Sequence, residues 1–149
     1  MIRTSLKRFL QPVPQSIPAS AALFLIRLIA GAAFVLHGWG KIQTPFGWNP
    51  PESPISIPVI FQFLAAISEF GGGIAWILGF LTPVGSLGIG CTMAVAVYFH
   101  SMIMKDPFVN MTGGSSFEPA LVYLGVALVF LVLGPGKFSL DKKIFGERK

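Results

Sequence analysis

The chain has 149 residues and a formal net charge of +5; 53% of its residues are apolar and only 11% are charged. Soluble domains carry about 25% charged residues, so this composition indicates a single-domain integral membrane protein and gives no support to nucleic-acid binding. The single cysteine, Cys91, excludes an intrachain disulfide, a CxxC redox pair and a zinc cluster. Because Cys91 lies in an apolar stretch, we expect it to be a small buried thiol.

Four apolar segments have the length that a helix needs to cross the hydrocarbon of a bilayer. None alternates like a barrel strand, so each predicts a helix. Their approximate ranges are 20–40, 58–81, 83–104 and 117–133. The sequence therefore predicts an all-α integral membrane protein built as a four-transmembrane-helix bundle.

The ends of these segments carry helix-capping patterns. Thr82 before Pro83 matches an N-cap followed by proline, and Ser115 with Glu118 matches a capping box. Glycine is expected to close the first and last helices, with a lysine then meeting the negative end of the helix dipole. The two segments concerned are GWGK (38–41) and GPGK (134–137).

The basic residues predict the orientation of the bundle. Most of the eleven Lys and Arg residues lie before the first span or after the last, namely Arg3, Lys7, Arg8, Lys137, Lys142, Lys143, Arg148 and Lys149. With four spans, this places both termini in the cytoplasm. We expect a cytoplasmic N-terminal segment (1–19), a membrane domain (20–142) and a basic cytoplasmic tail (143–149). A cleaved signal is not expected, because Arg27 interrupts the first apolar stretch.

Glu69 is the most informative polar residue, because residues 70–104 that follow it carry no formal charge. A charged side chain at the centre of a span costs roughly 2.5–3.5 kcal/mol, so we expect Glu69 to have a partner or a function. Arg27 lies nearer the inner end of the first span, and its long side chain could reach Glu69. The alternative is a structural role for Arg27, including contact with the inner headgroups.

Three further polar residues, His37, His100 and Glu118, are expected at a common depth, about 24 Å above the inner end at 1.5 Å per residue. Ordinary hydrogen bonding by the histidines and helix capping by Glu118 are the alternatives to a functional role. A metal site is not predicted, because two histidines and one glutamate on three helices are a weak pattern. The candidate polar network is Arg27, His37, Glu69, His100 and Glu118.

Small residues predict close helix packing. On the first helix one face carries Arg27, Gly31, Phe34, Gly38 and Lys41, which suits an inward-facing helix. Lys41 itself is interpreted as a helix terminus and an anchor at the membrane interface. A stripe on the third helix consists of Ser86, Gly90 and Ala94.

Together these motifs resemble the DoxX family of small four-helix membrane proteins over roughly residues 20–142. The resemblance lies in the order and spacing of the motifs, because each of them alone is modest. They are Arg27, Gly31, Phe34, His37, Gly38, Lys41, Glu69, Gly72, Gly73, LGFLT (78–82), His100, Glu118 and GPGKFSLD (134–141).

The resemblance implies an integral membrane subunit of a redox-associated complex, more readily a subunit of an oxidoreductase than a stand-alone enzyme. It also implies a bacterial inner membrane, or another bacterial energy-transducing membrane. A quinone would fit between helices that offer aromatic and polar groups, although no motif requires one. The expected partners are the lipid bilayer and either other membrane subunits or further copies of the chain.

Two other functions remain open at this point. A non-catalytic accessory subunit would dock onto a larger membrane complex through its loops and termini. A small-solute or lipid carrier would need an oligomer to form a path, and the sequence lacks the inverted repeat of transporters.

Overall fold

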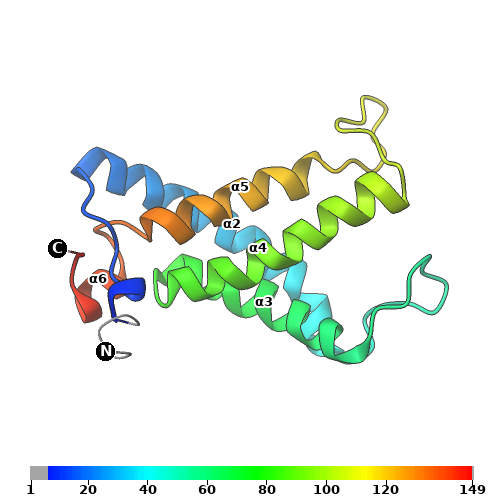
Figure 1. The fold of residues 1–149 in the computed structure, drawn as a ribbon, viewed down its shortest axis with the longest axis horizontal. Coiled ribbons are helices and arrows are strands. Elements are labelled where there is room, and N and C mark those ends of the chain that lie inside the picture. Colours follow the sequence, from blue (N-terminus) through cyan, green and yellow to red (C-terminus); the bar gives the residue numbers. More distant parts are fainter. Residues whose placement is uncertain (1–6, 149) are drawn as a thin grey trace.

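The computed structural model describes residues 7–148, and this range contains helices and loops but no strand. The elements are α2 (Ile17–Gln43), α3 (Val59–Leu78), α4 (Thr82–Tyr98), the π-helix η1 (Phe99–Ile103), α5 (Glu118–Leu133) and α6 (Leu140–Phe145). The loops 44–58 and 104–117 lie at one end of the bundle (Figure 1). The tight turn between α3 and α4 lies at the opposite end, with the termini. The predicted all-helical fold is confirmed.

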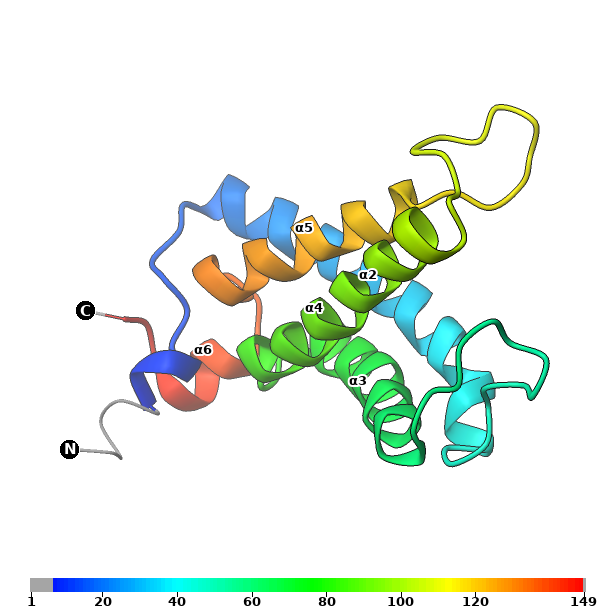
Figure 2. The same cartoon turned by 45° about the vertical axis from the view of Figure 1, so that its right-hand side comes forward.

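Three helical segments are long and apolar enough to cross a membrane: α2, α3 and α4 continued by η1, with 27, 20 and 22 residues. Helix α5 is equally apolar but has 16 residues, which corresponds to about 24 Å. It packs along α4 (Figure 2). A fourth crossing and the side on which the termini lie stay predictions.

The helix ends follow the sequence patterns only in part. Gly134 closes α5 with a positive φ of 75°, as predicted. The predicted glycine end of the first helix is wrong, because α2 continues past residues 38–41 to Gln43. The predicted capping box is also wrong: Phe117 is the N-cap of α5, and no side chain caps this helix end.

Glycines set the close packing of α2 against α3. A Cβ on Gly31 would lie 2.8 Å from the carbonyl oxygen of Gly73, and a Cβ on Gly38 would lie 2.5 Å from the nitrogen of Phe70. Real Cβ atoms do not approach backbone atoms so closely, so only glycine fits at these positions. The burial of Arg27, Gly31, Phe34 and Gly38 confirms the predicted inward face of the first helix.

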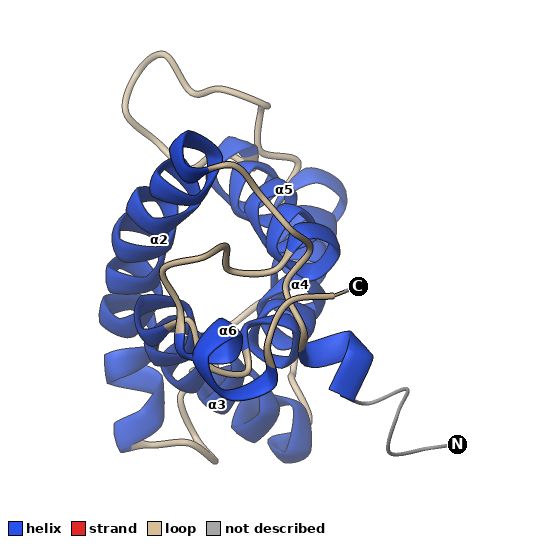
Figure 3. Ribbon diagram, turned by 90° about the vertical axis from the view of Figure 1, so that its left-hand side faces the viewer, coloured by secondary structure: helices blue, strands red, loops and turns tan. Residues whose placement is uncertain are grey.

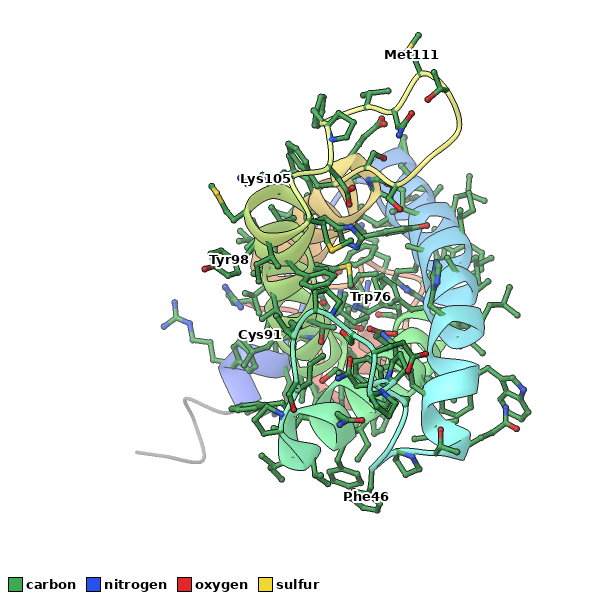
Figure 4. All side chains as sticks on the ribbon, turned by 90° about the vertical axis from the view of Figure 1, so that its right-hand side faces the viewer. Phe46, Trp76, Cys91, Tyr98, Lys105 and Met111 are labelled. Atoms are coloured by element: carbon green, nitrogen blue, oxygen red, sulfur yellow. The ribbon has the colours of Figure 1, made fainter. Side chains whose placement is uncertain are left out.

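An aromatic cluster forms the centre of the bundle. Trp76 is fully buried, and its ring lies edge-on to Phe34 and Phe130, with centroid distances of 5.4 and 5.0 Å. Its indole N–H donates to the hydroxyl of Ser86 (2.9 Å), as a buried indole requires. Viewed from the loop end, Trp76 lies inside the bundle while Tyr98 projects outward (Figure 4). In the predicted small-residue stripe Ser86 is buried, but Ala94 is exposed.

Arg27 holds the terminal end of the bundle together. Its guanidinium donates to four backbone carbonyls: Trp76 (2.7 Å) and Ile77 (3.0 Å) at the end of α3, and Pro135 (2.9 Å) and Phe138 (2.8 Å) after α5. A planar guanidinium with five donors can satisfy several acceptors at once. Arg27 therefore ties α2 to the end of α3 and to the segment that follows α5.

Asp141 completes this arrangement from α6, which lies across the end of the bundle (Figure 3). Its carboxylate accepts the backbone N–H groups of Leu81 (2.7 Å) and Thr82 (2.9 Å), which open α4. The predicted N-cap role of Thr82 is therefore wrong: α4 begins at Thr82 itself, and a carboxylate from the far end of the chain caps the helix. Negative charge at this end also suits the helix dipole.

Candidate functional site

A cavity of about 760 Å³ lies between α3 and α4 at the loop end of the bundle. The two helices are in contact near their common turn and diverge toward the loops (Figure 2). They still touch where Ser68 faces Gly88, because a Cβ on Gly88 would lie 2.8 Å from the Ser68 hydroxyl. Both residues line the cavity, so this contact forms its floor.

The walls of the cavity are mostly apolar and partly exposed on the outside of the bundle. Phe61 and Leu64 of α3 and Val95 of α4 line it and are 59%, 49% and 61% exposed. These side chains therefore offer a largely apolar surface to a ligand. Cys91 is another lining residue; it is exposed, so its predicted burial is wrong.

The polar end of the cavity is an ion pair between α2 and α3. The Lys41 ammonium lies 2.5 Å from Oε1 of Glu69, whose side chain is only 3% exposed. The other carboxylate oxygen, Oε2, is buried and has no hydrogen-bond partner within residues 7–148. Buried acceptors are nearly always paired in proteins, so the unpaired Oε2 of this cavity-lining residue calls for a donor that the described residues do not supply.

Loop 44–58 covers this polar end. The ammonium of Lys41 lies 4.6 Å from the centre of the Trp48 ring, so the charge is held between a carboxylate and an aromatic face. The indole N–H of Trp48 donates to the backbone carbonyl of Gln62 at 2.8 Å. The ring is thereby fixed over the ammonium.

Gln62, buried near the start of α3, organises the same loop. Its side-chain oxygen accepts the N–H of Asn49 (3.0 Å), and its amide nitrogen donates to the carbonyl of Ile57 (2.8 Å). The side chain of Asn49 in turn donates to the carbonyl of Ile55 (3.1 Å). The loop is therefore a structured cover, in which the glutamine makes the hydrogen bonds that a regular turn would supply.

A second polar pair lies at the cavity wall on the α4 side. Nδ1 of His100, within η1, is 2.7 Å from Oδ2 of Asp106. The backbone N–H of Asp106 also donates to the carbonyl of His100 (2.8 Å), which closes the chain after the π-helix. The carboxylate orients the imidazole, and π-helical turns occur frequently at functional sites.

The predicted polar network is only partly brought together. Glu69 and His100 both line the cavity. The predicted pairing of Arg27 with Glu69 is wrong, because Arg27 binds carbonyls at the terminal end and Glu69 binds Lys41. His37 is exposed, and Glu118 is half-buried at the start of α5, outside the cavity. Within residues 7–148, no three His, Cys, Asp or Glu residues come together as a metal site would require.

Sequence reasoning missed the roles of Lys41, Trp48 and Gln62. For Lys41 a signal was present, because it continues the inward face of the first helix one turn beyond Gly38. Because Gly38 packs against Phe70, the next turn of α2 brings Lys41 to Glu69. Gln62 offered a weaker signal, as a polar residue near the start of an apolar span.

These features define a class: an integral membrane protein whose helices enclose a largely apolar cavity with one buried ion pair. The DoxX family profile matches residues 22–102, and the chain belongs to the DoxX family. The resemblance inferred from the motifs is confirmed. Two of its relatives are named as inner membrane proteins, and the chain is an integral protein of the bacterial inner membrane.

Three relatives match most of the chain. "Inner membrane protein YqjF" of Escherichia coli (strain K12) is 31% identical over 121 residues, which cover 80% of this chain and 89% of the relative. "Putative oxidoreductase CatD" of Bacillus subtilis (strain 168) is 26% identical and covers 84% and 88%. "Inner membrane protein YphA" of E. coli (strain K12) is 27% identical and covers 84% and 86%. No solved structure matches the chain significantly.

Proposed function

We propose that this protein is the membrane subunit of a redox-associated complex and binds a lipid-soluble, quinone-type carrier in the cavity at Glu69. The observation that supports this most is the unpartnered Oε2 of Glu69, buried at the polar end of a largely apolar cavity. A cavity of about 760 Å³ falls in the range typical of small-molecule sites. One relative also carries the name "Putative oxidoreductase CatD".

The cavity suits a molecule that arrives through the bilayer. Its walls include lipid-facing positions such as Phe61 and Val95, which suit the apolar tail of a carrier. The polar head would lie at Glu69 and Lys41, beneath Trp48. A bound quinone supplies electron transfer coupled to protons, and the protein would orient its head and exclude water.

His100 extends this proposal to proton movement. Its imidazole lines the same cavity and is hydrogen-bonded to Asp106, which follows the π-helix at the loop end. Histidine exchanges protons readily near neutral pH. The pair would carry protons between the cavity and the loop surface, while Glu69 holds the head on the opposite wall.

Native extraction tests the ligand. The protein is taken from its membrane in polymer-bounded lipid discs, and the ratio of total quinone (oxidised plus reduced) to phospholipid is measured by mass spectrometry. We expect enrichment over bulk membrane with wild type, and a loss of about tenfold in the enrichment with Glu69→Gln, equivalent to 1.4 kcal/mol. The control Glu52→Gln removes the same charge from an exposed loop position and should retain the ligand. A wild-type ratio equal to that of the bulk membrane would refute the proposal.

An accessory role is the second candidate, favoured by the loop 104–117. Met111 and Phe108 of this loop are 91% and 52% exposed, as at a docking surface. Protein mass spectrometry of the same discs separates the candidates. An oxidoreductase subunit that co-purifies together with quinone supports the redox proposal. A stable larger complex without enriched quinone supports the accessory role.

A further inference from the structure

The two carboxylate oxygens of Glu69 differ in their hydrogen bonding. Oε1 accepts from the Lys41 ammonium, whereas Oε2 is buried without a partner within residues 7–148. A carboxylate paired with an ammonium is ionised and can only accept hydrogen bonds. The unpaired Oε2 therefore requires a donor, and an acceptor placed against it would be repelled.

Three of the polar side chains around the cavity use their donors elsewhere. The hydroxyl of Thr92 donates to the carbonyl of Gly88 (3.0 Å), and the indole of Trp48 donates to Gln62 (2.8 Å). The amide of Asn49 donates within its own loop. Since Oε2 has no partner within residues 7–148, its donor is left to the occupant of the cavity.

We propose that the cavity selects molecules that carry a hydroxyl donor on an apolar body. For the redox carrier this means that the reduced, dihydroxy form binds more tightly than the oxidised, dicarbonyl form. The inference about the carrier rests on the proposed function, whereas the preference for a hydroxyl rests on Glu69 alone. A dicarbonyl head offers only acceptors, and the Lys41 ammonium is already shared between Glu69 and Trp48. Hydrogen bonds to an ionised acceptor are about twice as strong as neutral ones, so the difference is measurable.

Cys91 provides the measurement, because it is the only cysteine of the chain, is exposed and lines the cavity. The protein is placed in phosphatidylcholine nanodiscs, and the rate of Cys91 alkylation by a small maleimide is followed as each ligand is added. Two matched pairs are compared: an alkylphenol with its methyl ether, and a fully substituted hydroquinone with its quinone. Full substitution prevents the quinone from adding to the thiol. Concentrations are expressed in the lipid phase, so that partitioning cancels.

The hydroxyl-bearing member of each pair should half-protect Cys91 at a concentration about tenfold lower than its partner, which corresponds to 1.4 kcal/mol. In Glu69→Gln the amide offers its own N–H donors, so the preference should vanish or reverse. Glu52→Gln should behave as wild type. Gel filtration verifies that each variant is folded, and the wild-type comparison stands without any variant.

Equal protection by the phenol and its ether in wild type would overturn the inference, as would no protection by either. The two proposals fail separately. If the phenol protects Cys91 at a lower concentration than its ether but no quinone is enriched in native discs, the hydroxyl selectivity stands and the quinone function fails. If quinone is enriched but the pairs are equivalent, the quinone function stands and the selectivity fails.

Discussion

At the scale of single residues, the terminal end of the bundle depends on one buried carboxylate. Asp141 is fully buried, and both of its oxygens accept backbone N–H groups at the start of α4. Its own N–H donates to the carbonyl of Gly79 (2.8 Å), so the turn from α3 to α4 is held on both sides. A carboxylate is needed here because only it presents two acceptor oxygens to two adjacent donors.

Asp141→Asn should destabilise the protein by about 1–3 kcal/mol, because the amide nitrogen would face a buried N–H that then lacks an acceptor. The free energy of unfolding in mixed micelles measures the effect. Glu147→Gln is the matched control, since Glu147 forms only a partly exposed ion pair with Lys142 (2.9 Å). That change should stay within about 0.5 kcal/mol. Equal effects of the two substitutions would contradict the capping role.

The same residue predicts a pH dependence. Burial raises the pKa of Asp141 above its usual value of 3.8, while the N–H groups of Thr82 and Leu81 and the charge of Arg27 oppose the rise. The unfolded chain then loses this proton first, so the contribution of Asp141 to stability falls as the pH rises from 3.8 through the folded-state pKa. The stability advantage of wild type over Asp141→Asn should therefore be larger near pH 4 than at about pH 7. The free energy of unfolding, measured for both proteins at the two pH values, tests this. An advantage of wild type that grows with pH would contradict the prediction.

At the scale of elements, the register between α2 and α3 determines the site. Gly31 and Gly73 allow the two backbones to meet, and Gly38 sits directly on Phe70. The turn after Gly38 carries Lys41, which this contact brings to Glu69. The ion pair is therefore a product of helix packing as much as of charge.

Gly38→Ala should destabilise the bundle by about 1–3 kcal/mol, because its Cβ would meet the backbone of Phe70 at 2.5 Å and push the helices apart. Gly40→Ala is the control two residues along the same helix, where a Cβ meets nothing within 4 Å. Since alanine favours helix over glycine, this control should be neutral or slightly stabilising. The midpoint of thermal unfolding distinguishes the two, and similar midpoints for both variants would rule out the packing argument.

At the scale of the whole molecule, the charged residues are distributed unevenly between the two ends. The basic residues of segments 7–10 and 137–148 lie at the end that carries the termini (Figure 1). The loop end carries the cavity, Glu52, Lys105 and Asp106. By the positive-inside rule the cavity would then lie nearer the outer face.

Cysteine accessibility tests this orientation and the fourth crossing together. In a Cys91→Ser background, a single cysteine at position 52 should react with a membrane-impermeant maleimide added to intact cells. A cysteine at position 143 should react only after the membrane is permeabilised. Labelling of both positions in intact cells would show that α5 does not return the chain to the cytoplasmic side.

The sequence predicted what depends on local pattern. Helical spacing identified the buried face that runs from Arg27 to Gly38. Glu69 was identified because it is an isolated charged residue in an apolar span. The sequence did not predict which cation meets Glu69, because that follows from the register between two helices. Asp141 was missed for a similar reason: the donors it caps lie 60 and 59 residues away, and capping rules consider only neighbours in sequence. The apolar character of its surroundings likewise suggested a buried Cys91, although composition does not say which face of α4 meets lipid.

The Arg27 contacts also bear on the order in which the chain is made. Two of its four carbonyl acceptors, Pro135 and Phe138, are synthesised more than a hundred residues after the arginine itself. Until they leave the ribosome, a newly inserted first helix carries a guanidinium with part of its donors unmet. A chain that stops before residue 135 therefore lacks both of these acceptors, and its Arg27 keeps N–H donors that the finished protein satisfies.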